Sequence, residues 1–322
     1  MESLLDISKA EKKNKLYDSI TPNRFKRTII KDWQLYVLCA PVIIYFLIFE
    51  FGPMYGVQLA FKDFIIGKGI WGSPWVGFKH FERFFTSYQF NIILRNTLVL
   101  SIYSLAAGFP FPVILAIMLN NIRGERFKKI VQTTTYAPHF ISVVVFCGMI
   151  NIFLSPSTGI VNFFIKQLRL EPIFFMGKAS MFSHIFVWSD IWQNTGWAAI
   201  VYIAALSGIN PELYEAAKID GANKLKSIWH VDLPGIMPTI ITLLIMRIGK
   251  ILSLGFQKAY LLQTPLNIDA SEIIATYTYK VGLLDAQYSY STAIGLFNTV
   301  VNILLLIMAN QLSKKFNDVS LW

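Results

Sequence analysis

The chain has 322 residues, of which 54% are hydrophobic and 15% charged, and its mean hydropathy is +0.50. A soluble domain of this size does not carry so much apolar surface, so the composition excludes that class and predicts a polytopic membrane protein. The net charge of +10 would suit a nucleic-acid-binding protein. A membrane protein accumulates the same excess in its cytoplasmic loops, so we expect no nucleic-acid partner.

Apolar stretches that reach the length of a membrane-spanning helix, about 20 residues, recur along the chain. They fall at 33–59, 94–119, 129–154, 182–206, 236–256 and 287–310. The sequence therefore predicts an all-α fold with six transmembrane helices over 33–310, flanked by tails at 1–32 and 311–322. The first tail is polar and basic without a cleavable hydrophobic segment, which favours a cytoplasmic tail over a signal peptide.

The distribution of basic residues predicts the orientation. An even number of spans puts both tails on one side, together with the loops at 120–130 and 207–237. These four segments carry seventeen of the lysines and arginines, and the three opposite loops carry nine. Basic loops stay in the cytoplasm, so we expect both termini and the loop 207–237 to be cytoplasmic.

Two predicted external loops, 61–92 and 158–170, are rich in aromatic and large aliphatic side chains. This pattern is typical of helices that lie along the outer membrane interface, and an ordinary aromatic belt explains it equally well. Several spans also contain proline or glycine, which indicates hinged helices around a water-filled path. We expect the sharpest hinge at Phe111, because a proline stands on each side of it.

Polar side chains interrupt two of the predicted spans. Asp190, Gln193 and Asn194 share one face of the fourth span, and Arg247 and Lys250 are spaced to share one face of the fifth. Charges within a membrane normally face a partner or an aqueous cavity. One interpretation is an Asp190–Arg247 ion pair that joins two helices. The other is the polar wall of a sugar pathway, to which the neighbouring aromatic rings would add stacking surfaces: Trp188, Trp192 and Trp197.

The strongest local pattern lies at 210–239, NPELYEAAKIDGANKLKSIWHVDLPGIMPT. Asn210 is a favoured N-cap and predicts the start of a short helix. Gly221 is expected to end that helix in a left-handed turn, so that a second short helix can form at about 222–230. Pro234 is expected to stop the second helix. On local physics alone, this could be an ordinary helical hairpin in a cytoplasmic loop.

The complete spacing is more specific, because E-A-A-x3-G-x9-[IV]-x-L-P is matched without a gap by Glu215, Ala216, Ala217, Gly221, Val231, Leu233 and Pro234. This pattern resembles the cytoplasmic coupling loop of permease subunits of ATP-binding-cassette (ABC) importers. Further segments resemble the carbohydrate branch of these permeases, closest to those for complex oligosaccharides and polysaccharide fragments: WVGFKHFERFF (75–85), ILRNTLVLS (93–101), LAIMLNN (115–121), TYAPHFIS (135–142) and SPSTGIVN (155–162).

The resemblance implies a type I ABC importer permease in a bacterial cytoplasmic membrane. It implies an ATPase dimer that docks on the coupling loop, a second, homologous permease subunit, and an external solute-binding protein that docks on a collar of the external loops. The substrate would be an oligosaccharide. ATP and magnesium would be bound by the ATPase, and this chain would bind no cofactor. The expected mechanism is alternating access, in which ATP-driven closure of the ATPase dimer moves the coupling loops.

Two other functions remain open on the residues alone. An ion-gradient-driven secondary transporter would explain charges within the membrane but has no use for a coupling loop. A membrane enzyme acting on lipid-linked sugars would need a catalytic carboxylate pair or a metal cluster. Asp190 has no second carboxylate within reach in the sequence, and the four histidines show no metal-binding spacing. We therefore expect a translocation subunit and no enzymatic activity.

The two cations of the fifth span suggest the charge of the substrate. Only Asp190 is an evident acidic partner within the membrane, so about one positive charge of Arg247 and Lys250 would stay unpaired. A buried unpaired charge costs several kcal/mol unless water or an opposite charge reaches it. The sequence thus favours an acidic oligosaccharide, for example one built from uronic acids.

Overall fold

The computed structural model describes residues 31–122, 124–317 and 320–321, so the predicted N-terminal tail at 1–32 lies almost wholly outside the described residues. Within them the secondary structure is helical apart from one isolated β-bridge between Lys62 and Trp75, and the all-α prediction is confirmed. The chain divides into two compact units, 1–58 and 59–322.

The described part of the first unit is one apolar helical run. It consists of α3 (Trp33–Tyr45), the π-helical turn η2 (Phe46–Phe51), α4 (Gly52–Met54) and the start of the 3-10 helix η3 (Tyr55–Phe61). Pro41 lies inside α3, and the widened turn η2 follows it. None of the residues of α3 is buried, so the apolar side chains of this helix are available to lipid or to another chain.

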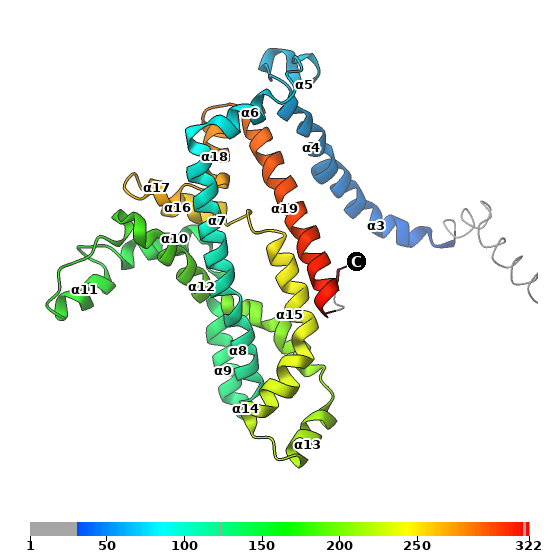
Figure 1. Ribbon diagram of the computed structural model, residues 1–322, viewed down its shortest axis with the longest axis vertical. Coiled ribbons are helices and arrows are strands. Elements are labelled where there is room, and N and C mark those ends of the chain that lie inside the picture. The colour runs from blue at the N-terminus through cyan, green and yellow to red at the C-terminus, as the bar shows by residue number, and fades with distance from the viewer. Residues whose placement is uncertain (1–30, 123, 318–319, 322) are drawn as a thin grey trace, which may run out of the picture. The chain divides into compact units, whose positions relative to one another are not determined.

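The second unit contains the remaining helices, and its α-helices are labelled in Figure 1. In chain order they are η4 (Ile66–Lys68), α5 (Gly69–Gly72), α6 (Lys79–Thr86), α7 (Tyr88–Gly108), α8 (Pro110–Asn120), α9 (Glu125–Tyr136), η5 (Ala137–Phe140), α10 (Val143–Phe153), α11 (Ile160–Gln167), η6 (Phe175–Gly177), α12 (Ala179–Ser207), α13 (Pro211–Ile219), α14 (Lys224–Ser227), η7 (Ile228–Asp232), α15 (Leu233–Ile248), α16 (Phe256–Leu262), α17 (Ile268–Ser271), α18 (Ile274–Tyr279), η8 (Lys280–Leu284) and α19 (Tyr288–Asn317).

Helix α12 is the centre of this unit, since it packs against α7, α8, α9, α15 and α16. Phe182, Phe186 and Val187 near its start belong to one buried apolar cluster, and Ala199 and Tyr202 near its end belong to another. The approach to α9 is very close, because a Cβ added at Gly196 would overlap the Thr135 carbonyl oxygen. The middle of α12 lies between the two clusters and carries its polar residues.

The membrane-spanning helices overlap the predicted positions, although the fifth ends at Ile248 and not at 256 as predicted. Within the described residues, four helices are long and apolar enough to cross a bilayer, and a bent pair raises the number to five if it is counted as one span. They are Trp33–Phe61, Tyr88–Asn120, Lys224–Ile248 and Tyr288–Lys315, with Glu125–Phe140 and Val143–Phe153 as the bent pair. Helix α12 has 29 residues and occupies the remaining predicted position, but its polar residues make it less apolar. The prediction of six spans is consistent with these helices.

One local prediction about helix geometry was wrong. The sharpest bend is not at Phe111 but between η5 and α10, where the axes differ by 99°. Pro110 and Pro112 stand in the first turn of α8, and α7 and α8 together still form one helical run, Tyr88–Asn120. The bend instead follows Pro138, and Ser142 caps the new helix by accepting from the Val145 N–H. Helix α19 also continues to Asn317, into the predicted C-terminal tail.

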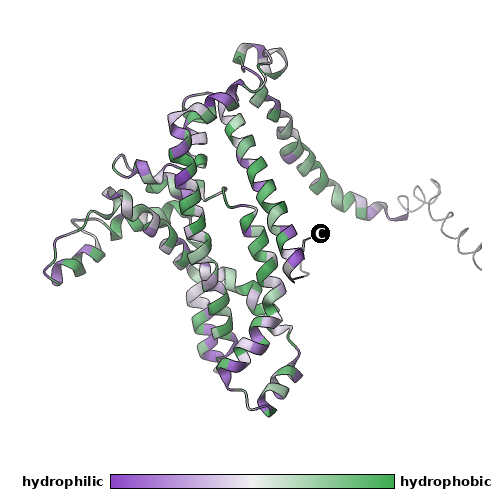
Figure 2. Ribbon diagram, viewed as in Figure 1, coloured by the Kyte–Doolittle hydropathy of each residue, from purple (hydrophilic) through white to green (hydrophobic). Residues whose placement is uncertain are grey.

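The predicted external segments form short helices whose packing differs. In α6, His80 and Phe84 are buried, and the Arg83 guanidinium lies 4.2 Å from the ring centre of Tyr290 in α19. In α11, only Asn162 is buried. Figure 2 shows apolar residues along the long helices and a mixture of polar and apolar residues in the hairpin formed by α13 and α14.

Candidate functional site

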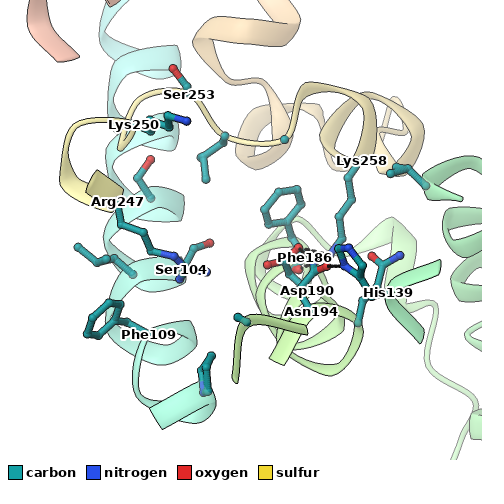
Figure 3. Close-up of a pocket in the computed structure, with 18 of the residues that line it drawn as sticks. Ser104, Phe109, His139, Phe186, Asp190, Asn194, Arg247, Lys250, Ser253 and Lys258 are labelled. Atoms are coloured by element: carbon teal, nitrogen blue, oxygen red, sulfur yellow. Dashed lines mark hydrogen bonds and ion pairs between the residues drawn. The ribbon is translucent and has the colours of Figure 1, made fainter. Parts of the chain in front are cut away.

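A cavity of about 980 Å³ lies between α7, α12, α15 and the segment that follows α15. Its walls are partly apolar and partly polar, and Figure 3 shows charged side chains on opposite sides of it. A volume of this size is at the upper end of the range of about 300–1,000 Å³ for small-molecule pockets. It is large for a single ion and suited to an extended polar molecule.

The structure brings five of the predicted path residues together in the wall of this cavity: Asp190, Gln193, Asn194, Arg247 and Lys250. They come from two helices, α12 and α15, and from the turn after α15. Gln193 is fixed there, because its Nε2 donates to the Ile141 carbonyl oxygen at 3.0 Å. The polar face that the sequence indicated on the fourth span thus borders a cavity.

The three predicted tryptophans do not line the cavity. The Trp188 indole N–H donates to the Tyr103 hydroxyl at 2.9 Å, and the Trp192 ring stacks on Phe146 with 5.8 Å between ring centres. The Trp197 ring stacks on His139 at 4.7 Å and 6°. Their rings therefore contact neighbouring side chains around α12, and the prediction that they offer stacking surfaces along the path has no support from this geometry.

The predicted ion pair between Asp190 and Arg247 was wrong. The cation that meets Asp190 is Lys258 in α16, whose Nζ lies 3.5 Å from the Asp190 Oδ1. The Lys258 side chain is only 7% exposed, and its Nζ also donates to the Phe186 carbonyl oxygen at 2.9 Å. Two phenyl rings complete its surroundings, with their centres 4.9 Å and 5.4 Å from the Nζ. Sequence reasoning missed Lys258, because its only signal was a lone lysine just beyond the expected end of the fifth span.

A chain of hydrogen bonds extends from this ion pair. The Asn194 Nδ2 donates to the Asp190 Oδ1 at 2.9 Å, and the Asn194 Oδ1 lies 2.9 Å from the His139 Nδ1. A carboxylate only accepts hydrogen bonds, so the amide must present its NH₂ to Asp190 and its oxygen to His139. His139 consequently carries a proton on Nδ1 and donates it. The path residues of α12 are thus held in one orientation.

Arg247 and Lys250 stand on the other side of the cavity (Figure 3). They do not share a helical face as predicted, because α15 ends at Ile248 and Lys250 lies in the following turn. A Cβ at Gly249 would lie 2.6 Å from Leu306 Cδ1 in α19. The turn is held in place by Asn302, whose Oδ1 accepts from the Leu252 N–H at 3.1 Å. Packing against α19 therefore ends the helix and keeps Lys250 beside Arg247 at the cavity.

The cavity has an excess of positive charge. Three cationic side chains line it, Arg247, Lys250 and Lys258, against one carboxylate, Asp190. The Asp190 carboxylate pairs with Lys258, and within the described part of the chain neither Arg247 nor Lys250 forms an ion pair. No group of three or more His, Cys, Asp or Glu side chains suited to a metal occurs among these residues. The arrangement can attract an anion of extended shape.

The second candidate site is the hairpin α13–α14, and its first half forms as predicted. The Asn210 Oδ1 accepts from the Glu212 N–H at 3.1 Å and caps α13. Gly221 follows the helix with φ at +74°, in the left-handed region that glycine adopts without strain. The Asn223 Oδ1 then caps α14 by accepting from the Lys226 N–H at 2.9 Å. These three side-chain and backbone features fix the shape of the hairpin.

The prediction that Pro234 stops the second short helix was wrong. The π-helical turn η7 follows α14 directly and continues into α15, so that Lys224–Ile248 is one helical run. Pro234 stands in the first turn of α15, and the wider turn before it accommodates the missing N–H. The second arm of the hairpin is therefore one end of a helix that is long and apolar enough to span a membrane.

The motif residues divide into exposed and partly buried ones. Glu215, Ala216 and Gly221 are exposed, whereas Val231 and Leu233 are half-buried. Large apolar side chains stand exposed beside them, at 53% for Leu213, 86% for Ile219, 76% for Leu225 and 67% for Trp229. Exposed apolar clusters in a loop mark interaction surfaces. The hairpin thus presents an unpartnered surface.

Comparisons with known proteins address both sites. Residues 108–318 match the model of the family described as "binding-protein-dependent transport system inner membrane component". Protein LplB of Bacillus subtilis (strain 168) is 44% identical over 292 residues, which is 91% of this chain and 92% of that protein. The polygalacturonan/rhamnogalacturonan transport system permease protein YteP of the same organism is 43% identical over 300 residues, 92% of this chain and 94% of that protein.

A solved structure is similar in both sequence and fold. It is a chain of a bacterial alginate ABC transporter in complex with an alginate pentasaccharide-bound periplasmic protein. The TM-score is 0.85 with 42% sequence identity, and the match covers 92% of this chain and all of that chain (100%). The similarity thus extends over the cavity and the hairpin alike.

Proposed function

The chain belongs to the family of binding-protein-dependent transport system inner membrane components, which makes it a multi-pass permease subunit and not an enzyme, and from this premise we propose that it imports acidic oligosaccharides. The observation that carries the proposal is the cavity with three cations and one carboxylate. YteP and the permease of the alginate transporter are similar over nine-tenths of the chain, and their descriptions name polygalacturonan/rhamnogalacturonan and the acidic polysaccharide alginate.

Charge balance is the physical argument for an acidic substrate. Lys258 is satisfied by Asp190, so the positive charges of Arg247 and Lys250 are left for whatever enters. Both side chains are exposed, and a substrate that covers them removes their charges from water, which costs several kcal/mol without a partner. A uronate residue brings a carboxylate that offsets this cost, and a neutral sugar does not. Substrate and cavity are thus complementary in charge, which gives selectivity as well as affinity.

The hairpin supports the proposed coupling to an ATPase. Glu215, Ala216, Ala217, Gly221, Val231, Leu233 and Pro234 would form the coupling motif. The small side chains Ala216 and Ala217 let another backbone approach closely, and the exposed Ile219 and Leu225 add apolar contact area. ATP and magnesium would be bound by an ATPase dimer, because two hairpins, one per permease subunit, fit a dimer.

The remaining partners and the orientation belong to the same proposal. The basic-residue distribution favours cytoplasmic termini and a cytoplasmic hairpin. An external solute-binding protein would deliver the oligosaccharide, as the periplasmic protein in the alginate transporter complex supports. A second, homologous permease subunit would complete the pathway, and membrane lipids would surround the pair. This chain would hold no cofactor of its own.

Transport of matched substrates tests the proposed specificity. In the reconstituted complex, uptake of an acidic oligosaccharide and of a neutral one of equal length would be measured for the native protein, Arg247→Gln and Lys250→Gln. We expect each substitution to lower the apparent affinity for the acidic substrate about tenfold, equivalent to about 1.4 kcal/mol, and to leave the neutral substrate unchanged. Lys314→Gln is the control, since it removes an exposed cation outside the cavity.

Two results would contradict the proposal. One is equal uptake of neutral and acidic substrates by the native complex. The other is an unchanged preference for acidic substrates in both cavity variants, which would show that Arg247 and Lys250 do not recognise the substrate's charge.

A further inference from the structure

Asp232 is the one acidic residue among the described residues that is buried, with 1% of its surface exposed. It stands inside the motif, at the position between Val231 and Leu233 where the spacing allows any residue type. None of the ion pairs in the described part of the chain includes it. A buried carboxylate needs hydrogen bonds to each of its oxygens.

Two different segments supply those hydrogen bonds. The Tyr214 hydroxyl in α13 donates to the Asp232 Oδ1 at 2.5 Å. The Asn121 Nδ2, at the C-terminal end of α8, donates to the Asp232 Oδ2 at 3.2 Å and also to the Ile117 carbonyl oxygen at 3.0 Å. Asp232 itself ends η7 and leads into α15. One carboxylate therefore joins the hairpin to two membrane-spanning helices.

The bond from Tyr214 is a stable one. Burial, together with the hydrogen bond to Asp232, raises the pKa of the Tyr214 phenol to about 12, so the hydroxyl keeps its proton at physiological pH and always donates. Hydrogen bonds to an ionised acceptor are about twice as strong as those between neutral groups. Tyr214 directly precedes Glu215, so the bond fixes the helix that presents the coupling motif.

Close packing surrounds this joint. Asp232 belongs to a π-helical turn, a rare geometry that occurs frequently at functional sites. A Cβ added at Gly235 would lie 2.5 Å from the Ile209 Cδ1, so the chain entering the hairpin packs directly on the start of α15. A stiff connection transmits a displacement, whereas a flexible one absorbs it.

We propose that Asp232 is a positioning residue for energy coupling: its two hydrogen bonds hold α13 to the cytoplasmic ends of α8 and α15, so that a displacement of the hairpin moves both spans together. The inference rests on the proposed coupling role of the hairpin. Asp232 touches neither substrate nor nucleotide in this scheme, and its effect on transport is exerted through the orientation of α13.

The test uses the complete complex of permeases, ATPase and binding protein in liposomes. Tyr214→Phe and Asp232→Asn would be compared with the native protein for substrate molecules imported per ATP hydrolysed. Losing one hydrogen bond should lower this ratio about threefold to tenfold, with ATPase rate and complex yield retained. The control is Tyr290→Phe, which removes the hydroxyl of a buried tyrosine in α19 that hydrogen-bonds Tyr277.

Hydrogen–deuterium exchange of the backbone amides of α13 is the second readout. It reports how firmly α13 is fixed, whether or not transport depends on these hydrogen bonds. We expect faster exchange in Tyr214→Phe and Asp232→Asn than in the native complex. Unchanged exchange would overturn the inference. So would a lower yield of complex with an unchanged import ratio, which would reveal a structural role alone.

Gly221→Val in the same assay separates this inference from the proposed function. If Gly221→Val lowers the import ratio and the Tyr214 and Asp232 variants do not, Asp232 has no positioning role and the hairpin keeps its coupling role. If none of the three variants lowers the ratio, the coupling role of the hairpin fails, and the inference fails with it. A lower ratio in all three, with Tyr290→Phe unchanged, supports both.

Discussion

The hairpin and the cavity are built in opposite ways. The hairpin is contiguous, from Asn210 to the start of α15, and its shape follows from caps and a glycine turn within 25 residues or so of sequence. The cavity draws its wall from α7, α12, α15 and the segment up to Lys258. In the hairpin the functional surface is exposed, whereas in the cavity Lys258 is 7% exposed and held by neighbours from other helices.

This difference shows why the two sites tolerate change differently. The exposed part of the hairpin depends on local backbone geometry, so a single altered φ preference should disturb it. The cavity depends on charges that are brought together by packing, so substitutions in it should change the stability of the complex and its selectivity for substrates. The predictions below test this contrast, beginning with the largest expected effect.

An all-or-none result is expected from cysteine labelling in sealed cells. In a background without Cys39 and Cys147, Ser157→Cys should react with an impermeant thiol reagent from outside, and Lys226→Cys should not, because the distribution of basic residues predicts a cytoplasmic hairpin. Both positions are exposed. Ser73 also lies in a predicted external loop, 61–92, but it is unsuitable for labelling because it is 3% exposed. Reaction of Lys226→Cys from outside would reverse the orientation and remove the hairpin from the ATP-containing side.

Gly221→Val should reduce ATP-driven import at least about tenfold while the protein still inserts in the membrane. At φ of +74°, a β-branched residue is strained by about 1–3 kcal/mol, and the turn between α13 and α14 would have to change. Uptake and ATPase stimulation by loaded binding protein are the measurements. Gly148→Val is the matched control, since that glycine has no positive φ and no atom within 4 Å of an added Cβ. Normal coupling in Gly221→Val would contradict the dependence of the hairpin on its local backbone geometry.

A smaller effect is expected from breaking the ion pair in the cavity. In Asp190→Asn, the buried charge of Lys258 keeps only the Phe186 carbonyl and two phenyl rings as neighbours. In Lys258→Met, the Asp190 carboxylate keeps its hydrogen bond from Asn194 and its contact with solvent, because its side chain is 43% exposed. We expect Asp190→Asn to lower the stability of the complex by about 1–3 kcal/mol and Lys258→Met to lower it by less.

Thermal denaturation of the purified complex checks the order of the two variants. The double variant should lose less than the sum of the single losses, because the two groups interact directly. An additive result, or a larger loss in Lys258→Met, would mean that the pair does not hold α12 to α16 in the working protein.

Much of the fold could be read from the sequence because its signals are local. Apolar stretches located the long helices, and basic residues favoured one orientation. Asn210 and Gly221 gave the hairpin its limits, since a cap and a left-handed turn depend on residues a few positions apart. The motif spacing then identified the family, which the match over 108–318 established.

The tertiary structure decided which charges meet. Asp190 pairs with Lys258, 68 positions away, and not with Arg247. The reason is that α16 packs against α12, where the Lys258 Nζ also donates to the Phe186 carbonyl oxygen. Nothing local in the sequence specifies that return. Likewise, the motif allows any residue type at the position of Asp232. Only the folded chain brings the side chains of Tyr214 and Asn121 to its two carboxylate oxygens. Ion pairs and buried hydrogen bonds act over a few ångströms, so the sequence supplied the groups and the packing of distant helices chose their partners.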